Sequence, residues 1–418
     1  MHDVEIVRDV VYGHGLVGRA RDAGPQSRPL KLDLYLPAVD GSGSARPALV
    51  MAFGGAFHRG SKENDSFEGG TNTSVSDYCL RFARRGYVAC AIDYRLATED
   101  PEPGATRVIS SPSSLPTSRV DVVRRILDLP PATPDMLWRS IESASDDMAA
   151  AVHFVRHHAR DWDVDPARIA LGGFSAGART ALNAAFGEKA PVAAVVSLSG
   201  FIDAKDLAHH VPKGSGGPAT LLVSAENDLA YVRDATPGIA RHLRGAGMHC
   251  DCVQVLGAGH FYPAEAAALE DRDGARSVAT TVEAAMVDFL SRTLAPPVDT
   301  AMLEAFADAW NRHDINALMT YMTPDCMFDA SFGPDPCGTR YEGSTAVREG
   351  FSRTWREYPD AQWRHARHFT AGTRGVSEWT FTGTRASDGV RVEADGMDLF
   401  TFEAGRIRIK NSWRKQRP

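Results

Sequence analysis

This 418-residue chain lacks any long hydrophobic run, since no stretch approaches the roughly 18 apolar residues of a membrane-spanning helix. Residues 1–5 show neither the basic region nor the apolar segment of a secretory signal. The chain also lacks an excess of positive charge, because 46 Lys and Arg stand against 53 Asp and Glu. We therefore expect a cytoplasmic protein whose main partners include neither nucleic acid nor a membrane.

Cysteine is scarce as well. The chain has six: Cys79, Cys90, Cys250, Cys252, Cys326 and Cys337. Without a secretory signal these are expected to be reduced thiols. Cys250 and Cys252 would share one face of a strand, but no second Cys or His pair has zinc-site spacing. The sequence thus predicts no metal site and no bound cofactor.

The most informative segment that is present is 173–177, Gly-Phe-Ser-Ala-Gly. It follows an apolar run, 168–172, that is typical of a buried strand, and it precedes a helix-like run at 178–186. A strand, a G-x-S-x-G turn and a helix together form the context of a nucleophile elbow. Glycines suit such a tight turn, and the helix N-terminus favours developing negative charge. The segment therefore predicts Ser175 as a nucleophile.

A nucleophilic serine needs a base and a carboxylate that orients the base. Two further apolar runs, 219–225 and 252–256, each end in a loop with a suitable side chain. The first loop offers Asp228, with Glu226 as an alternative acid, and the second offers His260. The carboxyl ends of parallel strands are where open α/β sheets place their sites. We predict a Ser175, Asp228 and His260 triad.

A glycine-rich loop follows another strand-like run, 47–53, and contains Gly55 and Ala56. Its backbone N–H groups are candidates for an oxyanion hole, together with the N–H of Ala176, the residue after the nucleophile.

Residues 1–295 resemble the serine esterase and lipase branch of the α/β-hydrolase family. The resemblance depends on segments 54–56, 93–96, 165–169 and 173–177, with Asp228 and His260. It implies a doubly wound, mostly parallel sheet and a small-molecule carboxylic ester as substrate. Members of this branch carry His-Gly-Gly-Gly in the oxyanion loop, where this chain has Phe53 for the His and Ala56 for the last Gly.

Residues 96–145 form an insertion that the core fold does not require. Residues 100–118 are rich in Pro and Ser, and 119–129 places Val120, Val123, Ile126 and Leu127 on one helical face. The insertion is interpreted as a lid or pocket wall, and a surface excursion is the alternative. A second piece of the insertion, 134–142, is also expected to be helical. Beyond the insertion, Ser145 is expected to cap a separate helix that runs to about Arg160.

Two consecutive prolines in 296–299 indicate a linker to a second domain, 300–418. Helix-like runs there precede strand-like runs, which indicates an α+β domain. Segments 305–311, 379–384 and 395–407 resemble the SnoaL-like group of the nuclear transport factor 2 cone fold. Candidate bases within it are Asp325, Asp329 and Asp395, with His365 or Tyr341 as helpers.

Two functions remain open for this combination. The first is a serine ester hydrolase whose C-terminal domain mediates homodimerisation or completes the ester pocket. The second is a bifunctional protein whose C-terminal domain is a cyclase or isomerase acting on a polyketide-like or ketone molecule.

Overall fold

The computed structural model describes residues 2–38, 45–64, 71–272, 278–296, 298–403 and 405–415. The chain divides into two compact units, Met1–Leu294 and Ala295–Pro418. The division lies beside the predicted linker, of which Pro297 falls outside the described residues, as does Ala404 of the cone-like segment 395–407. No described helix has both the length and the apolar character needed to span a membrane.

The first unit contains a ten-stranded sheet in the order β1-β2-β4-β3-β5-β6-β7-β8-β9-β10. The six central strands from β4 to β8 pair in parallel, and antiparallel strands flank them on both sides. The sheet confirms the predicted doubly wound, mostly parallel α/β architecture. Its strands are β1 Val4–Val17, β2 Gln26–Pro37, β3 Arg46–Ala52, β4 Val88–Ile92, β5 Val164–Phe174, β6 Ala194–Leu198, β7 Ala219–Asn227, β8 Cys250–Gly259, β9 Ala267–Arg272 and β10 Val278–Thr281.

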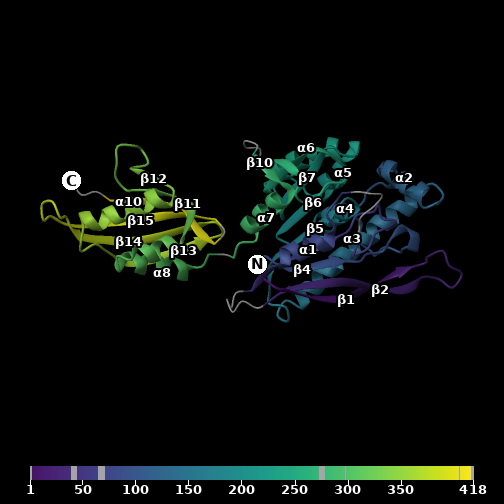
Figure 1. The fold of residues 1–418 in the computed structure, drawn as a ribbon, viewed down its shortest axis with the longest axis horizontal. Helices are drawn as coiled ribbons and strands as arrows, with labels where there is room; N and C mark the ends of the chain where they lie inside the picture. Colours follow the sequence, from purple (N-terminus) through teal and green to yellow (C-terminus); the bar gives the residue numbers. More distant parts are fainter. Residues whose placement is uncertain are drawn as a thin grey trace. The chain divides into compact units, whose positions relative to one another are not determined.

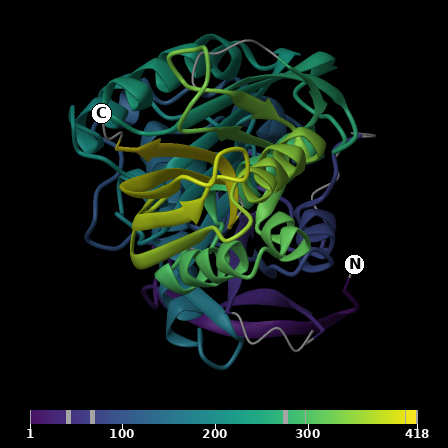
Figure 2. The same cartoon turned by 90° about the vertical axis from the view of Figure 1, so that its left-hand side faces the viewer.

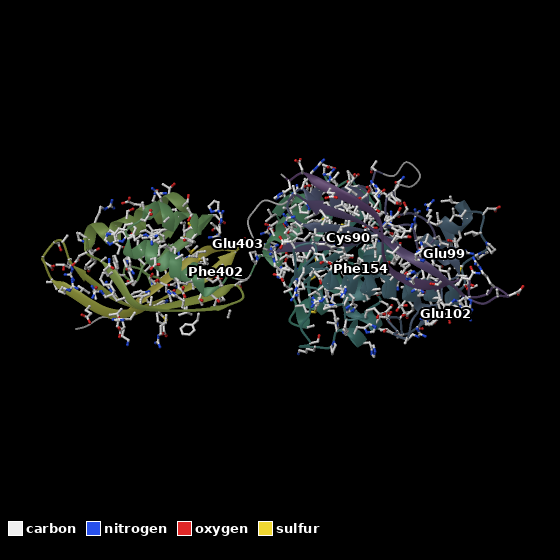
Figure 3. The ribbon with its side chains drawn as sticks, turned by 90° about the horizontal axis from the view of Figure 1, so that it is seen from below. Cys90, Glu99, Glu102, Phe154, Phe402 and Glu403 are labelled. Atoms are coloured by element: carbon white, nitrogen blue, oxygen red, sulfur yellow. The ribbon has the colours of Figure 1, made fainter. Side chains whose placement is uncertain are left out.

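Helices lie on both sides of this sheet (Figure 1). Buried strands such as β4 are apolar along their whole length, as expected where both faces are covered, and Cys90 on β4 is fully buried (Figure 3). The helices are α1 Val75–Ala83, α2 Ser118–Ile126, α3 Pro134–His157, α4 Ala176–Phe186, α5 Ala204–His210, α6 Ala230–Gly245 and α7 Val282–Thr293, with short 3₁₀ turns η1 Ala97–Glu99 and η2 Pro112–Ser114.

The predicted start of one helix was wrong. Helix α3 begins at Pro134 rather than at Ser145, and the Thr133 hydroxyl caps it by accepting from the Met136 N–H at 3.2 Å. Ser145 lies inside the helix and donates its hydroxyl to the Ile141 carbonyl. Thr133 followed by proline at the first helical position is the stronger start signal. The helical piece expected at 134–142 and the core helix are therefore one continuous element, whereas α2 is a separate helix.

A buried ion pair anchors α3, the helix with which the insertion ends, to the core. The Arg95 guanidinium, just after β4, bonds to the Asp147 carboxylate on α3 at 2.7 Å, and its backbone N–H donates to the same carboxylate at 2.8 Å. A two-point contact of this kind fixes α3 against the end of β4.

The second unit contains a six-stranded sheet in the order β12-β11-β16-β15-β14-β13, in which only β11 and β16 are parallel. Figure 2 shows its strands curling beside the helices. Aromatic residues of α8, α10 and β15 pack into one core, with Phe402 buried next to the partly exposed Glu403 (Figure 3). The elements are α8 Thr300–Asn311, α9 Ile315–Thr320, α10 Ser344–Glu357, β11 Met322–Asp329, β12 Arg340–Glu342, β13 Gln362–Ala371, β14 Arg374–Thr384, β15 Arg391–Glu403 and β16 Arg406–Arg414.

Candidate active site

Ser175 sits on a sharp turn between β5 and α4, with φ 54° and ψ −112°. This conformation is unfavourable for a residue with a side chain and occurs mostly where function requires it. Two glycines leave the necessary room. A Cβ on Gly177 would lie 2.0 Å from the Ala52 carbonyl oxygen, and one on Gly173 would lie 2.4 Å from the Gly177 backbone. The turn therefore has the geometry of a nucleophile elbow.

The structure brings the three predicted triad residues together. His260 follows β8 directly, and its Nε2 lies 2.8 Å from Ser175 Oγ. Its Nδ1 lies 2.6 Å from Oδ1 of Asp228, which follows β7. All three residues therefore come from the carboxyl ends of neighbouring parallel strands. In this arrangement Nδ1 donates to Asp228, and Nε2 is left to accept the Ser175 proton.

The surroundings of Asp228 keep it ionised. Burial would raise the pKa of this carboxyl, but the hydrogen bond and charge of His260, with donors from the Ala225 N–H and the Ser199 hydroxyl, outweigh burial and lower the pKa. The alternative acid, Glu226, is exposed and accepts the Gly257 N–H at 2.8 Å. The geometry thus favours Asp228 over Glu226 as the partner of His260.

Sequence reasoning missed two residues behind Asp228. The Ser199 hydroxyl, directly after β6, lies 2.5 Å from Asp228 Oδ2 and 2.9 Å from the Tyr262 hydroxyl. Because the single Ser199 proton goes to the carboxylate, the Tyr262 hydroxyl donates to Ser199. The sequence did contain a signal for Ser199. The apolar run 194–198 before it indicates one more strand, which ends at the same edge of the sheet as β5, β7 and β8.

The predicted oxyanion loop reaches the same place. Ala56 and Ala176 line the cavity that contains Ser175, and so does Phe57. Gly55 is buried and is not among the described residues that line it. Ala56 and Phe57 both have positive φ, 56° and 62°, so this loop is a strained segment. Ala176 is the first residue of α4, where backbone N–H groups have no partner within the helix.

The insertion helps to hold this loop. Arg124 of α2 lies 2.9 Å from His58 Nε2, and His58 Nδ1 lies 2.7 Å from the Ala56 carbonyl. Because Arg124 can only donate, Nε2 accepts and Nδ1 carries the proton that bonds to Ala56. Burial lowers the pKa of His58, which favours this neutral tautomer. Val120 of α2 and Leu137 of α3 line the Ser175 cavity, so the insertion forms part of its wall.

The predicted polar residues of the second unit do not converge. Asp329 is buried and pairs with Arg340 at 2.7 Å, and Asp325 is exposed near Arg408. Asp395 and His365 lie along an open hollow on the sheet. Of these five residues, only Tyr341 lines the cavity that we call the aromatic cavity. Its ring stacks on that of Phe328, with 5.7 Å between the centroids. The other aromatic lining residues are Trp310, Tyr358, Trp363, Trp379, Phe332 and Phe381.

A different pair of charges lies beside that cavity: Lys410 lines it, and its partner Asp398 lines a neighbouring one. Lys410 Nζ lies 2.6 Å from Asp398 Oδ1 and also 2.6 Å from the Ser412 hydroxyl, while the Trp379 indole N–H donates to Asp398 Oδ2. Both charged residues are buried, and burial lowers the pKa of Lys410. The alternation of side chains along β15 could have indicated Asp398. Asp395 faces one side of the sheet, and the buried residues face the other: Ala394, Asp398, Phe400 and Phe402.

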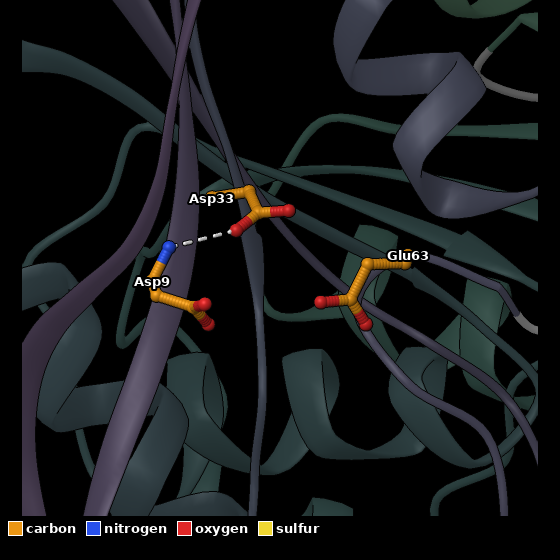
Figure 4. Close-up of side chains that lie close together, drawn as sticks. All are labelled: Asp9, Asp33 and Glu63. Carbon is orange, nitrogen blue, oxygen red and sulfur yellow. Dashed lines mark hydrogen bonds between the residues drawn. The ribbon is translucent and has the colours of Figure 1, made fainter.

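One group of three carboxylates could in principle hold a cation in the described part of the chain. Asp9, Asp33 and Glu63 come close together in the first unit (Figure 4). The ammonium of Lys62 already occupies this place, 2.7 Å from Asp33, 3.2 Å from Asp9 and in contact with Glu63. Arg8 also pairs with Asp33 at 2.6 Å and Lys31 with Asp9 at 3.7 Å, so three cations of the chain balance the three carboxylates. All six cysteines are free thiols.

Two family models match the chain. Residues 303–409 match the SnoaL-like domain, and residues 139–237 match the BD-FAE family, an α/β-hydrolase-type domain. The second match contains Ser175 and Asp228, whereas His260 lies beyond it. No curated protein matches the chain.

Solved structures similar to each unit are also known. Esterase 2 of Thermogutta terrifontis phosphoramylated by tabun is 20% identical, with 62% of this chain and 84% of that chain covered and a TM-score of 0.40. The propionate-bound form of that esterase has the same identity, coverage and TM-score. A candidate polyketide cyclase from Xanthomonas campestris pv. campestris is 22% identical, with 28% and 89% covered and a TM-score of 0.25.

The family matches confirm the predicted combination of an α/β-hydrolase-type domain and a SnoaL-like domain. The BD-FAE match also supports carboxylic ester hydrolase activity.

Proposed function

We propose that this protein is a serine hydrolase that cleaves a small-molecule carboxylic ester through an acyl-enzyme. The observation that carries the proposal is the hydrogen-bonded series from Ser175 Oγ to His260 Nε2, at 2.8 Å, and from His260 Nδ1 to Asp228 Oδ1, at 2.6 Å. The ester carbonyl would enter the cavity that Ser175 and Ala176 line.

In the first half of the reaction, Ser175 Oγ attacks the carbonyl carbon while His260 Nε2 takes the hydroxyl proton. Asp228 stabilises the imidazolium that forms. The Ala176 N–H and the N–H groups of the Gly55–Ala56 loop stabilise the oxyanion, which requires that they are aimed at it before the substrate arrives. The imidazolium then returns its proton to the departing alcohol, and the acyl-enzyme remains.

In the second half, water replaces the alcohol. His260 removes a proton from the water, the resulting hydroxide attacks the acyl carbon, and collapse of the second tetrahedral intermediate returns the proton to Ser175. The carboxylic acid leaves. Two features support this proposal: the strained backbone of Ser175, and the close packing around Gly173 and Gly177, where no Cβ would fit. Both hold Oγ in position throughout the cycle.

The test combines turnover with covalent labelling. Wild-type protein and Ser175→Ala are assayed on p-nitrophenyl esters of graded chain length and treated with an organophosphonate. We expect turnover to fall by several orders of magnitude in the variant and the label to reside on Ser175. Labelling at another serine, or unchanged turnover in a folded Ser175→Ala protein, would overturn the proposal.

A second candidate function concerns the second unit, where an aromatic cavity of about 600 Å³, counting its open mouth, contains a buried ammonium. Lys410 Nζ lies 5.3 Å from the Trp310 ring centroid and 5.0 Å from that of Phe328. Aromatic walls with a buried Lys–Asp pair suit an enolisable ketone, as the cyclase or isomerase alternative requires. Deuterium incorporation into a ketone panel by the full-length Ser175→Ala protein tests this, and exchange that survives Asp398→Asn would argue against it.

A further inference from the structure

A charge without a counter-ion lies in the cavity next to Ser175. Arg179 is on α4, four residues after Ser175, so the two side chains lie on the same face of the helix. Both line a cavity of about 430 Å³, counting its open mouth. Arg179 is only 6% exposed, which is unusual for an arginine that has no partner.

No described residue satisfies this guanidinium. The buried Nε of Arg179 has no hydrogen-bond partner, and no carboxylate of the described residues pairs with Arg179 within 4 Å. The guanidinium lies over the Phe201 ring, with its carbon 5.1 Å from the ring centroid. Burial lowers the pKa of Arg179 to about 10, so the side chain is charged at neutral pH. A buried, unpaired charge is costly unless a ligand pairs with it.

Three carboxylates act on the charge of Arg179 from a distance, and each is engaged elsewhere. Asp203 accepts the Lys205 N–H at 2.8 Å and does not line the cavity. Asp206 accepts the Ser110 N–H at 2.9 Å and its hydroxyl at 2.5 Å. Glu142 accepts the N–H groups of Val108 and Ile109. Neither Asp206 nor Glu142 lines the cavity, and no other Asp or Glu is among the described lining residues.

A second arginine faces the same space. Arg119 of α2 lines the cavity, and its guanidinium lies 5.2 Å from the Phe261 ring centroid. Tyr231 of α6 also lines the cavity and can add a hydroxyl donor. The unpaired Arg179 guanidinium and the Tyr231 hydroxyl, with no carboxylate among the described lining residues, form a site that prefers an anion beside the nucleophile.

We propose that Arg179 binds a carboxylate on the substrate, so that the esters cleaved at Ser175 are half-esters of dicarboxylic acids. This inference rests on the proposed ester hydrolase function. A carboxylate oxygen would accept from the free edge of the Arg179 guanidinium, and its charge would neutralise the cavity. Neutral esters of equal length would leave Arg179 unpaired and would be poorer substrates.

The experiment compares matched esters on the full-length protein. Monomethyl succinate, glutarate and adipate are set against methyl butyrate, pentanoate and hexanoate. We expect wild-type kcat/KM to favour the half-esters by about 10- to 100-fold at the best length, as charge-assisted hydrogen bonds allow. Arg179→Met should bring the ratio close to one, and Arg179→Lys should keep part of it. Arg125→Gln, an exposed position of α2 that does not line the cavity, is the matched control and should leave the ratio unchanged.

Thermal stability provides a readout that does not depend on turnover. Free glutarate should raise the Tm of the wild-type protein and not that of Arg179→Met. The variant alone should be at least as stable as wild type, because an unpaired buried charge is removed. A large loss of Tm in Arg179→Met with equal effects on both ester series would mean a structural role and overturn the inference.

Failure of this inference and failure of the proposed function look different. Equal hydrolysis of half-esters and neutral esters, with no effect of glutarate on Tm, would overturn the role of Arg179 and leave the hydrolase intact. No hydrolysis of either series, with no labelling of Ser175, would overturn the hydrolase itself.

Discussion

The two units of this chain position their polar side chains by different means. In the first, Ser175, Asp228 and His260 lie in loops at the ends of strands. In the second, Asp398 and Lys410 lie within β15 and β16, where they line two neighbouring cavities with aromatic walls. A loop residue keeps its place through local turn geometry, whereas a strand residue keeps it through packing of a whole sheet. The difference predicts loss of activity from changes in the first unit and loss of stability from changes in the second.

The largest expected effect is that of Asp228→Asn. The amide cannot stabilise the imidazolium or fix the His260 tautomer, so we expect kcat to fall by roughly 10⁴ with little change in Tm. Glu226→Gln is the matched control, because Glu226 lies in the same loop and accepts only from Gly257. Steady-state kinetics on one p-nitrophenyl ester measure both. A greater loss in Glu226→Gln would mean that the acid is misassigned.

Lys410→Met should show the reverse pattern. It leaves the Asp398 carboxylate buried without its counter-ion, which costs about 3–5 kcal/mol of unfolding free energy. Ester turnover by the first unit should persist at temperatures where the protein is folded. Calorimetry of full-length chains measures the loss. Lys410→Met combined with Asp398→Leu should recover much of it, and a double variant as unstable as the single one would contradict this account of the pair.

A smaller effect concerns assembly. We predict a homodimer formed through the sheet of the second unit, where Met397 and Trp413 are paired neighbours that are 39% and 52% exposed. Met397→Glu should shift the chain toward monomer while kcat on p-nitrophenyl esters is retained. Light scattering after size exclusion decides the point. A monomeric wild-type protein would remove the prediction.

The smallest expected effect is on the pH dependence of stability, and it comes from Asp146 on α3. Burial raises the pKa of Asp146 to about 7, with the Glu188 charge adding and the Gly104 N–H opposing. The folded state therefore holds a proton that the unfolded chain releases above about pH 4, so this group makes the fold less stable as pH rises from 4 through 7.

Asp146→Asn should remove that penalty. At pH 8 we expect its Tm to exceed that of wild type by a few degrees, since about 1 kcal/mol shifts Tm by roughly 2–4 °C in a domain of this size. At pH 4 the two should coincide. The exposed Asp135→Asn variant of the same helix is the control, and an equal difference at both pH values would contradict the assignment.

The contrast between the two units also explains which features could be predicted from the sequence. The parallel sheet and the spacing of Ser175, Asp228 and His260 were predictable because each residue follows an apolar run that ends in a glycine-rich or polar loop. Ser199 was missed because its strand, β6, was not recognised. Arg179 was not recognisable either, since an arginine in a helix is ordinarily exposed and only the fold shows it 6% exposed.

In the second unit, the candidate acids were chosen by residue type alone. Asp395 and Asp398 are three residues apart on one strand, so at most one of them can face the cavity. The start of α3 shows a related limit. Ser145 satisfies its hydroxyl within the helix by bonding to Ile141, and this option makes a serine ambiguous as a start signal.

Gly177 and the end of β3 have a mechanical consequence for the active site. Their backbones approach so closely that not even a methyl group fits between them, and Gly54 beside them allows no Cβ either, because Phe174 would lie 2.8 Å from it. The nucleophile turn and the oxyanion loop therefore have no slack in which to move independently. We therefore expect the two segments to move together, so that substrate binding requires no rearrangement of this part of the site.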